Sequence, residues 1–186
     1  MLYRYILSVA ALALVWIANG KWLGEAVRQR VTSEIYMHLG LGLFFTLLVA
    51  EGILDPLGAL QLSVLWVRVT GYALYLPAAY LVLASHQALK KVNPEAADLT
   101  ATTVFVDTGV YELVRQPMTL GMFLWTIGLM LVFQSAFSVI LGIPSLLCFW
   151  MSATKESGYN ISKFGDAYEA YMKRVPMWNP LKRLRP

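Results

Sequence analysis

Residues 106–121 read Val-Asp-Thr-Gly-Val-Tyr-Glu-Leu-Val-Arg-Gln-Pro-Met-Thr-Leu-Gly, and within this stretch a polar segment becomes an apolar one. Its charged residues all lie before Pro117, and an uncharged, largely apolar run follows at 118–133. Proline suits the first turn of a helix, because the N–H that it lacks would have no partner there. Residue 116 is pushed towards extended geometry. The stretch therefore predicts a polar segment at a membrane surface and a helix that begins at Pro117 and enters the lipid.

The composition of the whole chain indicates a membrane protein. Of its 186 residues, 58% are hydrophobic and 14% are charged, whereas a soluble domain carries about 25% charged residues. Crossing the hydrocarbon core takes about 20 predominantly apolar residues. Runs that approach or reach this length lie at about 2–19, 35–54, 62–84, 118–133 and 136–151. The sequence thus predicts an all-α integral membrane protein with about five transmembrane helices in a single membrane domain over 1–186.

The spacing of the runs indicates how the helices connect. Only Gln134 and Ser135 separate the last two runs, so these should form a tight helical hairpin. A polar connection, 86–117, precedes the hairpin and is long enough to suggest function rather than linkage. The first run could also be a signal peptide with Arg4 at its start. It is long for one, however, and more basic residues follow it, which favours a retained span.

The distribution of lysine and arginine predicts the orientation. These residues gather in the loop 20–32, the connection 86–117 and the tail 152–186, whereas the loop 51–61 and the turn 134–135 hold none. Five spans place the three basic segments on one side, and the positive-inside rule makes that side cytoplasmic. We therefore expect the N-terminus outside and the C-terminus in the cytoplasm, in the cytoplasmic (inner) membrane of a prokaryote.

The tail carries an amphipathic pattern. Phe164, Tyr168, Tyr171 and Val175 recur at helical spacing, with charged residues between them. This pattern predicts a cytoplasmic helix that lies at the membrane interface or against the connection. A purely structural role is as consistent with the pattern as a functional one.

Several kinds of chemistry have no residues to support them. Only His38 and His86 are histidines, and the single cysteine, Cys148, lies on a different span with no ligand spacing, so no metal site is predicted. No glycine-rich phosphate loop occurs, and we expect no nucleic-acid partner. What remains is a group of polar residues near the predicted cytoplasmic mouth: Tyr111, Glu112, Arg115, Gln116, Lys155, Glu156 and Arg174. Ionisable groups at such a mouth suggest a site, and they fit interfacial anchors equally well.

Two motifs resemble those of one enzyme family. Residues 109–121 resemble the G-x-Y-x-x-x-R-H-P-x-Y-x-G motif of the isoprenylcysteine carboxyl methyltransferase and phospholipid methyltransferase family. Glu156, followed by Phe-Gly-Asp-Ala-Tyr-Glu-Ala-Tyr at 164–171 and Arg-Val-Pro at 174–176, is similar to that family's E-E-x(6)-F-G-x-x-Y-x-x-Y-x-x-x-V-P pattern. The resemblance covers about 68–180, and the layout of five spans suits the small microbial members.

The resemblance implies an integral membrane methyltransferase that uses S-adenosylmethionine. The cofactor would lie between the last spans, the connection and the tail, and it would be bound by Tyr111, Arg115, Gln116, Pro117 and Gly121. The catalytic residues would be Glu156 and Arg174, handling the acceptor or the cofactor carboxylate. The acceptor would be a lipophilic small molecule or a lipid-anchored substrate that arrives from the membrane lipids. A prenylcysteine carboxylate, a phospholipid amine and a small thiol all stay open.

The sequence departs from the family pattern at three positions. The motif's histidine is Gln116, its second tyrosine is Thr119, and the second glutamate is Ser157. Glutamine can exchange hydrogen bonds but cannot carry a proton as imidazole does, whereas an ionised carboxylate acceptor would need no base. A non-catalytic member that binds a lipid or a partner protein is therefore an alternative, and a nicotinamide-dependent membrane reductase is a further one. Glycines at 40, 42, 121 and 128 allow close helix packing within one chain or between two, so the oligomeric state is open.

Overall fold

The computed structural model describes residues 2–54, 61–92 and 105–179. Its elements, in chain order, are α1 (Leu2–Arg28), α2 (Thr32–Val49), the π-helix η1 (Ala50–Leu54), α3 (Leu65–Val92), the 3-10 helix η4 (Gly109–Glu112), α4 (Pro117–Phe133), α5 (Ala136–Phe164) and α6 (Asp166–Arg174). Over these described ranges the extended pairing consists of an isolated bridge between Gln61 and Ser135. The prediction of an all-α fold is confirmed.

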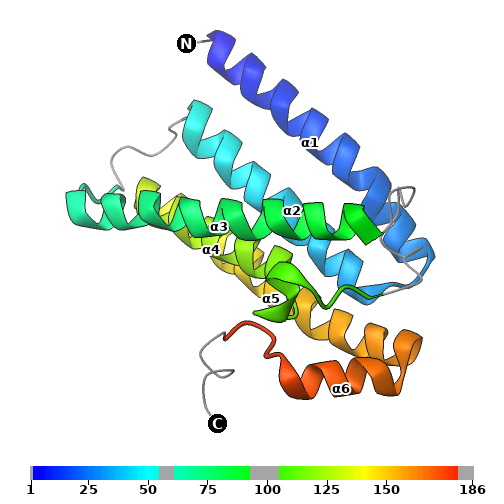
Figure 1. The fold of residues 1–186 in the computed structure, drawn as a ribbon. Helices are drawn as coiled ribbons and strands as arrows, with labels where there is room; N and C mark the ends of the chain where they lie inside the picture. The colour runs from blue at the N-terminus through cyan, green and yellow to red at the C-terminus, as the bar shows by residue number, and fades with distance from the viewer. Residues whose placement is uncertain (1, 55–60, 93–104, 180–186) are drawn as a thin grey trace.

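The long helices have the dimensions of membrane spans. Among the described residues, α1, α2, α3 and α5 are long and apolar enough to cross a bilayer. The apolar helix α4 has 17 residues, a length of about 26 Å at 1.5 Å per residue. It lies within the bundle, next to α3 and α5 (Figure 1). The chain is therefore an integral membrane protein in which, among the described helices, α4 is the short apolar one.

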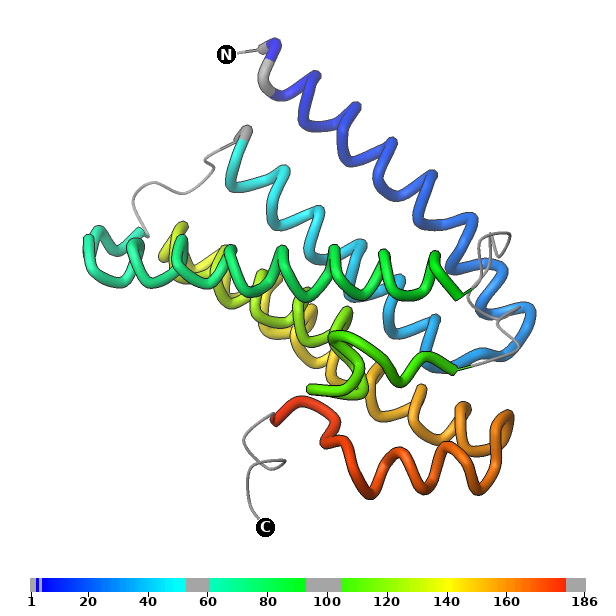
Figure 2. The backbone as a smooth tube through the Cα atoms, viewed as in Figure 1, coloured from blue at the N-terminus to red at the C-terminus, as the bar shows by residue number. Residues whose placement is uncertain are grey.

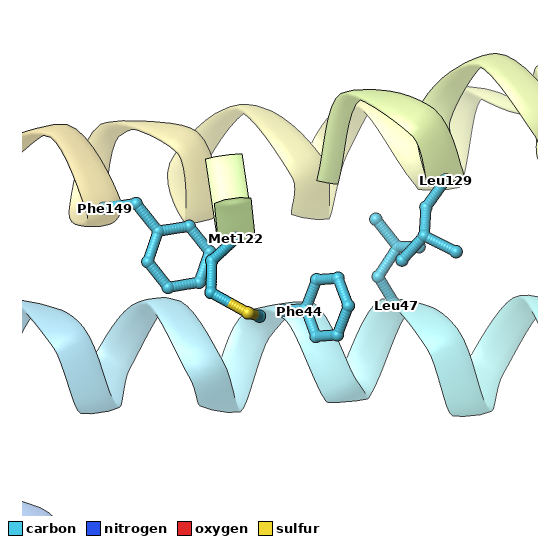
Figure 3. Packing of buried hydrophobic residues seen from close by; sticks show 5 residues of the cluster. All are labelled: Phe44, Leu47, Met122, Leu129 and Phe149. Atoms are coloured by element: carbon cyan, nitrogen blue, oxygen red, sulfur yellow. The ribbon is translucent and has the colours of Figure 1, made fainter. Parts of the chain in front are cut away.

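The bundle is built from pairs of helices. α3 packs along α4, and α2 packs along α5. α1 lies at the edge of the bundle and packs mainly on α2, as the tube view in Figure 2 also shows. Between the helices, side chains from α2, α4 and α5 meet in a buried cluster: Phe44, Leu47, Met122, Leu129 and Phe149 (Figure 3). This cluster fixes the relative positions of α2 and the hairpin.

Glycines allow α3 and α4 to touch through their backbones. A Cβ atom on Gly71 would lie 2.8 Å from the carbonyl oxygen of Gly128. A Cβ atom on Gly121 would lie 2.9 Å from the carbonyl oxygen of Ala78. Real Cβ atoms do not approach oxygen so closely, so larger residues would push the two helices apart. Gly121 and Gly128 thus serve packing within this chain.

The hairpin forms as the sequence predicts. α4 begins at Pro117, and Gln134 ends it in the left-handed conformation, with φ 52°. Ser135 then caps α5, because its Oγ accepts a hydrogen bond from the backbone N–H of Ser138 at 2.8 Å. The Gln134 side chain also exchanges hydrogen bonds, each 3.0 Å long, with the backbone of Val64. The turn therefore anchors the start of α3 as well as joining α4 to α5.

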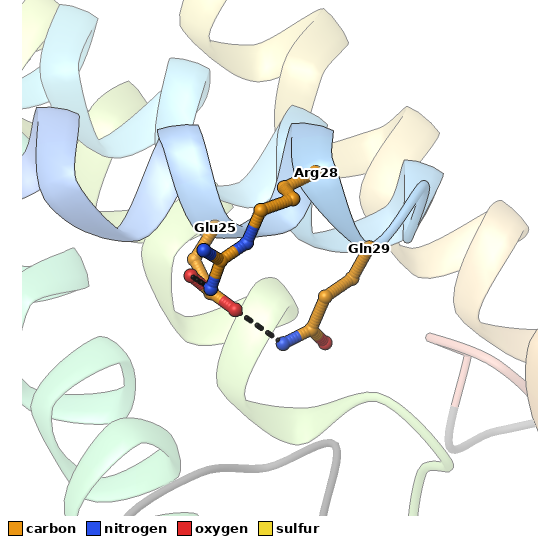
Figure 4. Close-up of polar contacts among 3 residues, drawn as sticks. All are labelled: Glu25, Arg28 and Gln29. Atoms are coloured by element: carbon orange, nitrogen blue, oxygen red, sulfur yellow. Dashed lines mark hydrogen bonds and ion pairs between the residues drawn. The ribbon is translucent and has the colours of Figure 1, made fainter.

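Three helices continue past the apolar runs that predicted them. α1 extends to Arg28, where Glu25 contacts both Arg28 and Gln29 (Figure 4). α3 extends to Val92, into the predicted connection, and α5 extends to Phe164. Hydropathy marks where lipid ends, but helical hydrogen bonds can continue into water, so the two boundaries differ. The rest of the connection at 93–104 and the end of the tail lie outside the described residues.

The amphipathic tail helix is shorter than the pattern suggests. Gly165, with φ +59°, separates α5 from α6, so Phe164 ends α5 instead of beginning the tail helix. Tyr168, Tyr171 and Val175 nevertheless form one buried cluster that packs against Phe105, Ile161, Phe164 and Met172. The predicted apolar face is confirmed, and in the structure it packs against the connection and the end of α5.

Candidate active site

The tail holds the segment that precedes α4. Gln116 has φ −126° and ψ 61°, and the proline after it disfavours helical geometry there. The backbone N–H of Arg115 donates to the carbonyl oxygen of Pro176 at 2.9 Å, and that of Gln116 donates to the carbonyl oxygen of Met177 at 3.4 Å. The position of both residues therefore depends on the tail.

A cavity opens beside this segment, between α2, α5, the connection and α6. Its volume is about 120 Å³, and the empty space around it, which includes open solvent, is about 950 Å³. Polar side chains in its lining include Glu34, Tyr111, Arg115, Gln116, Thr119, Ser152, Glu156, Asn160, Tyr168 and Tyr171. Apolar side chains include Met37, Leu89, Phe105, Met118 and Phe164. Polar groups that converge on a partly apolar cavity are the usual arrangement of a small-molecule site.

Arg115 and Gln116 bring unpaired donors to the cavity. Nε of Arg115 and Nε2 of Gln116 are buried and form no hydrogen bond of good geometry among the described residues, although the Gln116 side chain lies close to the Glu156 carboxyl. Nη1 of Arg115 donates to Oγ of Ser157 at 3.3 Å, which holds the guanidinium in place. An unpaired buried donor costs about 1–3 kcal/mol. Two neighbouring donors of this kind fit a ligand that brings acceptor groups.

Two carboxyl groups face the same cavity. Glu156 of α5 lies beside the side chains of Gln116 and Asn160. Glu34, in the first turn of α2, lines the cavity from the opposite helix and is close enough to act electrostatically on Glu156. Glu34 was not among the site residues predicted from the sequence. The only signal for it was a carboxylate at the start of a span, a position that anchoring residues also occupy.

Tyrosines form the wall on the side of α6. The hydroxyl of Tyr171 donates to the carbonyl oxygen of Tyr111 at 2.6 Å, which joins α6 to the connection. Burial raises the pKa of the Tyr111 hydroxyl, and the charge of Glu156 raises it further. Burial, and secondarily Tyr168, raises the pKa of Tyr171 in the same way. These phenols are therefore neutral hydrogen-bond donors at physiological pH.

The structure brings together four of the predicted site residues. Tyr111, Arg115, Gln116 and Glu156 all line the cavity.

The other three predicted site residues lie elsewhere. Pro117 is buried at the start of α4, and Gly121 packs against α3. The side chain of Arg174 is 69% exposed, and it pairs with Asp107 at 3.7 Å on the surface. These three can act on the cavity only through the backbone or through a neighbour.

The fold and the cavity define a class: an integral membrane helical bundle with a polar site at one end, closed by a connection and an amphipathic tail. Within that class, this chain belongs to the phospholipid methyltransferase family, whose family model matches residues 66–167. The match covers α3, the connection, the hairpin and the start of α6, which are most of the elements around the site.

Two curated relatives align with part of the chain. A protein-S-isoprenylcysteine O-methyltransferase of Schizosaccharomyces pombe is 37% identical over 79 residues, which are 42% of this chain and 34% of that protein. An enzyme of the same description from Dictyostelium discoideum is 32% identical over 73 residues, 39% of this chain and 31% of that protein. The alignments thus span about a third of the length of these relatives. No solved structure matches the chain significantly.

Proposed function

We propose that this chain is a membrane methyltransferase that uses S-adenosylmethionine and methylates a lipophilic or membrane-delivered acceptor. The observation that carries the proposal is the pair of buried, unpaired donors on Arg115 and Gln116 in the cavity wall. Family membership and two relatives named as O-methyltransferases support it. When bound, S-adenosylmethionine supplies a methyl group on a positively charged sulfur.

The residues of the cavity fit that cofactor. The guanidinium of Arg115 would pair with its carboxylate, because a charge-assisted hydrogen bond satisfies the free Nε. Tyr111 and Gln116 would donate to its other acceptor atoms. Pro117 and Gly121 would shape the pocket through the backbone of α4, since neither residue lines the cavity.

Glu156 is our candidate for the group that meets the acceptor. It lies in the cavity beside Gln116, whereas the exposed Arg174 would act by holding Asp107 and so the connection. A transfer of this kind depends mainly on positioning and on exclusion of water. The acceptor is one of three classes: a prenylcysteine-like carboxylate, a phospholipid amine or a small thiol. We further propose that the site faces the cytoplasm, with the N-terminus outside.

The test is calorimetric titration of the detergent-purified protein with S-adenosylmethionine and with S-adenosylhomocysteine. We expect saturable binding in the wild type and at least a tenfold weakening in Arg115→Ala, which corresponds to about 1.4 kcal/mol. The matched control is Arg28→Ala. It removes the same charge from an arginine whose side chain is 76% exposed at the end of α1, paired with Glu25.

Each alternative gives a different result in this titration. If neither cofactor binds at millimolar concentration, the methyltransferase proposal is wrong, and a non-catalytic lipid- or partner-binding member of the family is the better description. If a reduced nicotinamide cofactor binds and S-adenosylmethionine and S-adenosylhomocysteine do not, a membrane reductase is the better description. Equal weakening in Arg115→Ala and Arg28→Ala would mean that Arg115 is not a cofactor ligand.

A further inference from the structure

Ser157 lies between α5 and the guanidinium of Arg115. It is buried, with 8% of the residue exposed, and its Oγ accepts a hydrogen bond from Nη1 of Arg115 at 3.3 Å. The same hydroxyl donates to the carbonyl oxygen of Ala153, one turn earlier in α5, at 3.2 Å. A serine hydroxyl has one proton and two lone pairs, so donation to Ala153 leaves the lone pairs for the guanidinium. The hydroxyl is therefore an oriented acceptor for Arg115.

Arg115 is held at two points and open at a third. Its backbone N–H donates to the carbonyl oxygen of Pro176 at 2.9 Å, and its Nη1 donates to Ser157. Its Nε, in contrast, is buried without a hydrogen bond among the described residues. An arginine loses rotamer freedom when it binds a ligand, and a contact that orders the side chain beforehand reduces this loss. The guanidinium is thus preorganised, and its Nε is available to a ligand.

The positive charge of Arg115 is not matched by an ion pair in the part of the chain that the structure describes. The two ion pairs there lie at the end of α1 and on the surface beside α6, and neither includes Arg115. The groups beside its guanidinium include the hydroxyls of Ser157 and Tyr168. A hydroxyl can accept a hydrogen bond from a guanidinium but does not neutralise its charge. A carboxylate ligand would do both, through a charge-assisted hydrogen bond.

We propose that Ser157 is a positioning residue that holds Arg115 for the carboxylate in the amino-acid group of S-adenosylmethionine. This inference rests on the proposed function. Ser157 occupies the position at which the family pattern has its second glutamate. A glutamate that reached Arg115 from there would orient the guanidinium and also neutralise it, whereas serine orients it and leaves its charge to the ligand. This departure from the pattern thus has a role in cofactor binding, which Ser157 exerts through Arg115.

The experiment measures the dissociation constants of S-adenosylmethionine and of decarboxylated S-adenosylmethionine by calorimetry on the detergent-purified protein. The two molecules share the nucleoside, the sulfonium and the amine, and they differ by the carboxylate. We expect the wild type to bind the form with the carboxylate about tenfold more tightly. In Ser157→Ala we expect this ratio of dissociation constants to fall to about threefold or less, because S-adenosylmethionine binds more weakly.

Two further variants separate positioning from a loss of structure. Ser157→Thr keeps the hydroxyl, and we expect it to keep the ratio of the wild type. Ser145→Ala removes another buried hydroxyl of α5, which donates to the carbonyl oxygen of Gly40 at 3.0 Å, and it should leave the ratio unchanged. Alanine has a higher helix propensity than serine, so we expect Ser157→Ala to unfold close to the wild-type temperature.

The outcomes separate this inference from the proposed function. If the wild type binds neither form, the methyltransferase proposal and this inference both fail. If the wild type binds S-adenosylmethionine and Ser157→Ala leaves the ratio unchanged or weakens both forms equally, the inference is wrong and the methyltransferase proposal stands. A wild type that binds both forms equally also overturns it, because Arg115 would then not pair with the carboxylate. The same loss of the ratio in Ser157→Thr or in Ser145→Ala would mean that the Ser157 hydroxyl is not what positions Arg115.

Discussion

At the scale of single residues, Pro117 determines what Arg115 and Gln116 can do. Gln116, the residue before the proline, avoids helical geometry. Residues 115 and 116 therefore lie outside α4, and their N–H groups pair with the tail. Their side chains then line the cavity next to Glu156. One local steric preference therefore connects the start of a membrane helix to the position of two residues that are candidates for binding the cofactor.

The hydrogen bond between Tyr171 and Tyr111 allows a test of how α6 is held. Tyr171→Phe removes the hydroxyl that donates to the carbonyl oxygen of Tyr111 at 2.6 Å, so that oxygen loses this donor. We expect a loss of about 1–3 kcal/mol in stability and weaker cofactor binding, measured by thermal unfolding and calorimetry. The control is Tyr80→Phe, at a tyrosine of α3 that is 62% exposed. Equal effects of the two substitutions would contradict the assigned role.

The tyrosine wall also predicts a dependence of stability on pH. Burial raises the pKa values of Tyr111 and Tyr171 above their unfolded value of about 10. Between the unfolded and folded values the folded state binds more protons, so its stability falls as pH rises there. The contribution is fully present below about pH 10 and is lost above it. Thermal unfolding from pH 8 to 11 should show this fall, and Tyr171→Phe should reduce its slope; an unchanged slope would contradict the assignment.

At the scale of elements, the contact between α3 and α4 decides how the connection enters the site. Their backbones meet at glycines, so the end of α3 lies close to η4 and Leu89 reaches the cavity. The same contact explains why position 121 is a glycine, because this residue packs against Ala78. The resemblance had assigned Gly121 to cofactor binding. Helix packing and site formation therefore depend on the same residues.

Gly71→Ala tests this contact directly. The added Cβ would lie 2.8 Å from the carbonyl oxygen of Gly128, which can only be relieved by moving a helix. Overpacking of this kind costs about 1–3 kcal/mol, and we expect a corresponding drop in the unfolding temperature in detergent. Gly20→Ala is the matched control, because nothing lies within 4 Å of its added Cβ. The same loss in both variants would mean that α3 and α4 do not meet through glycine.

At the scale of the whole molecule, the site and the hairpin turn lie at opposite ends of the helical bundle. The start of α2, the end of α3, the end of α5 and α6 meet around the cavity, and among the described residues Lys90, Lys91 and Arg115 belong to this end. The hairpin turn at Gln134 and Ser135 lies at the other end and contacts the start of α3. In the proposed orientation, the cavity would therefore face the cytoplasm.

Reporter fusions can test this orientation. With the C-terminus in the cytoplasm, a C-terminal green fluorescent protein should fluoresce in bacterial cells, and an alkaline phosphatase at the same place should be inactive. This expectation rests on the unequal distribution of lysine and arginine between the two sides, because basic loops stay in the cytoplasm. Replacing Lys90 and Lys91 by glutamine should weaken the preference without reversing it, since the other basic segments remain. An active C-terminal phosphatase in the unaltered chain would contradict the predicted topology.

The sequence by itself determined what depends on neighbours along the chain. The start of α4 at Pro117, the hairpin turn and the apolar face of the tail follow from steric limits, capping and period, and all three are confirmed. Only the tertiary structure decided which distant side chains share the cavity. How far each helix rotates and where it crosses its neighbours depends on contacts such as those of Gly71 and Phe149, and local pattern carries no record of them. For that reason Glu34 reaches the site from α2, while Arg174, inside a recognisable motif, lies on the surface.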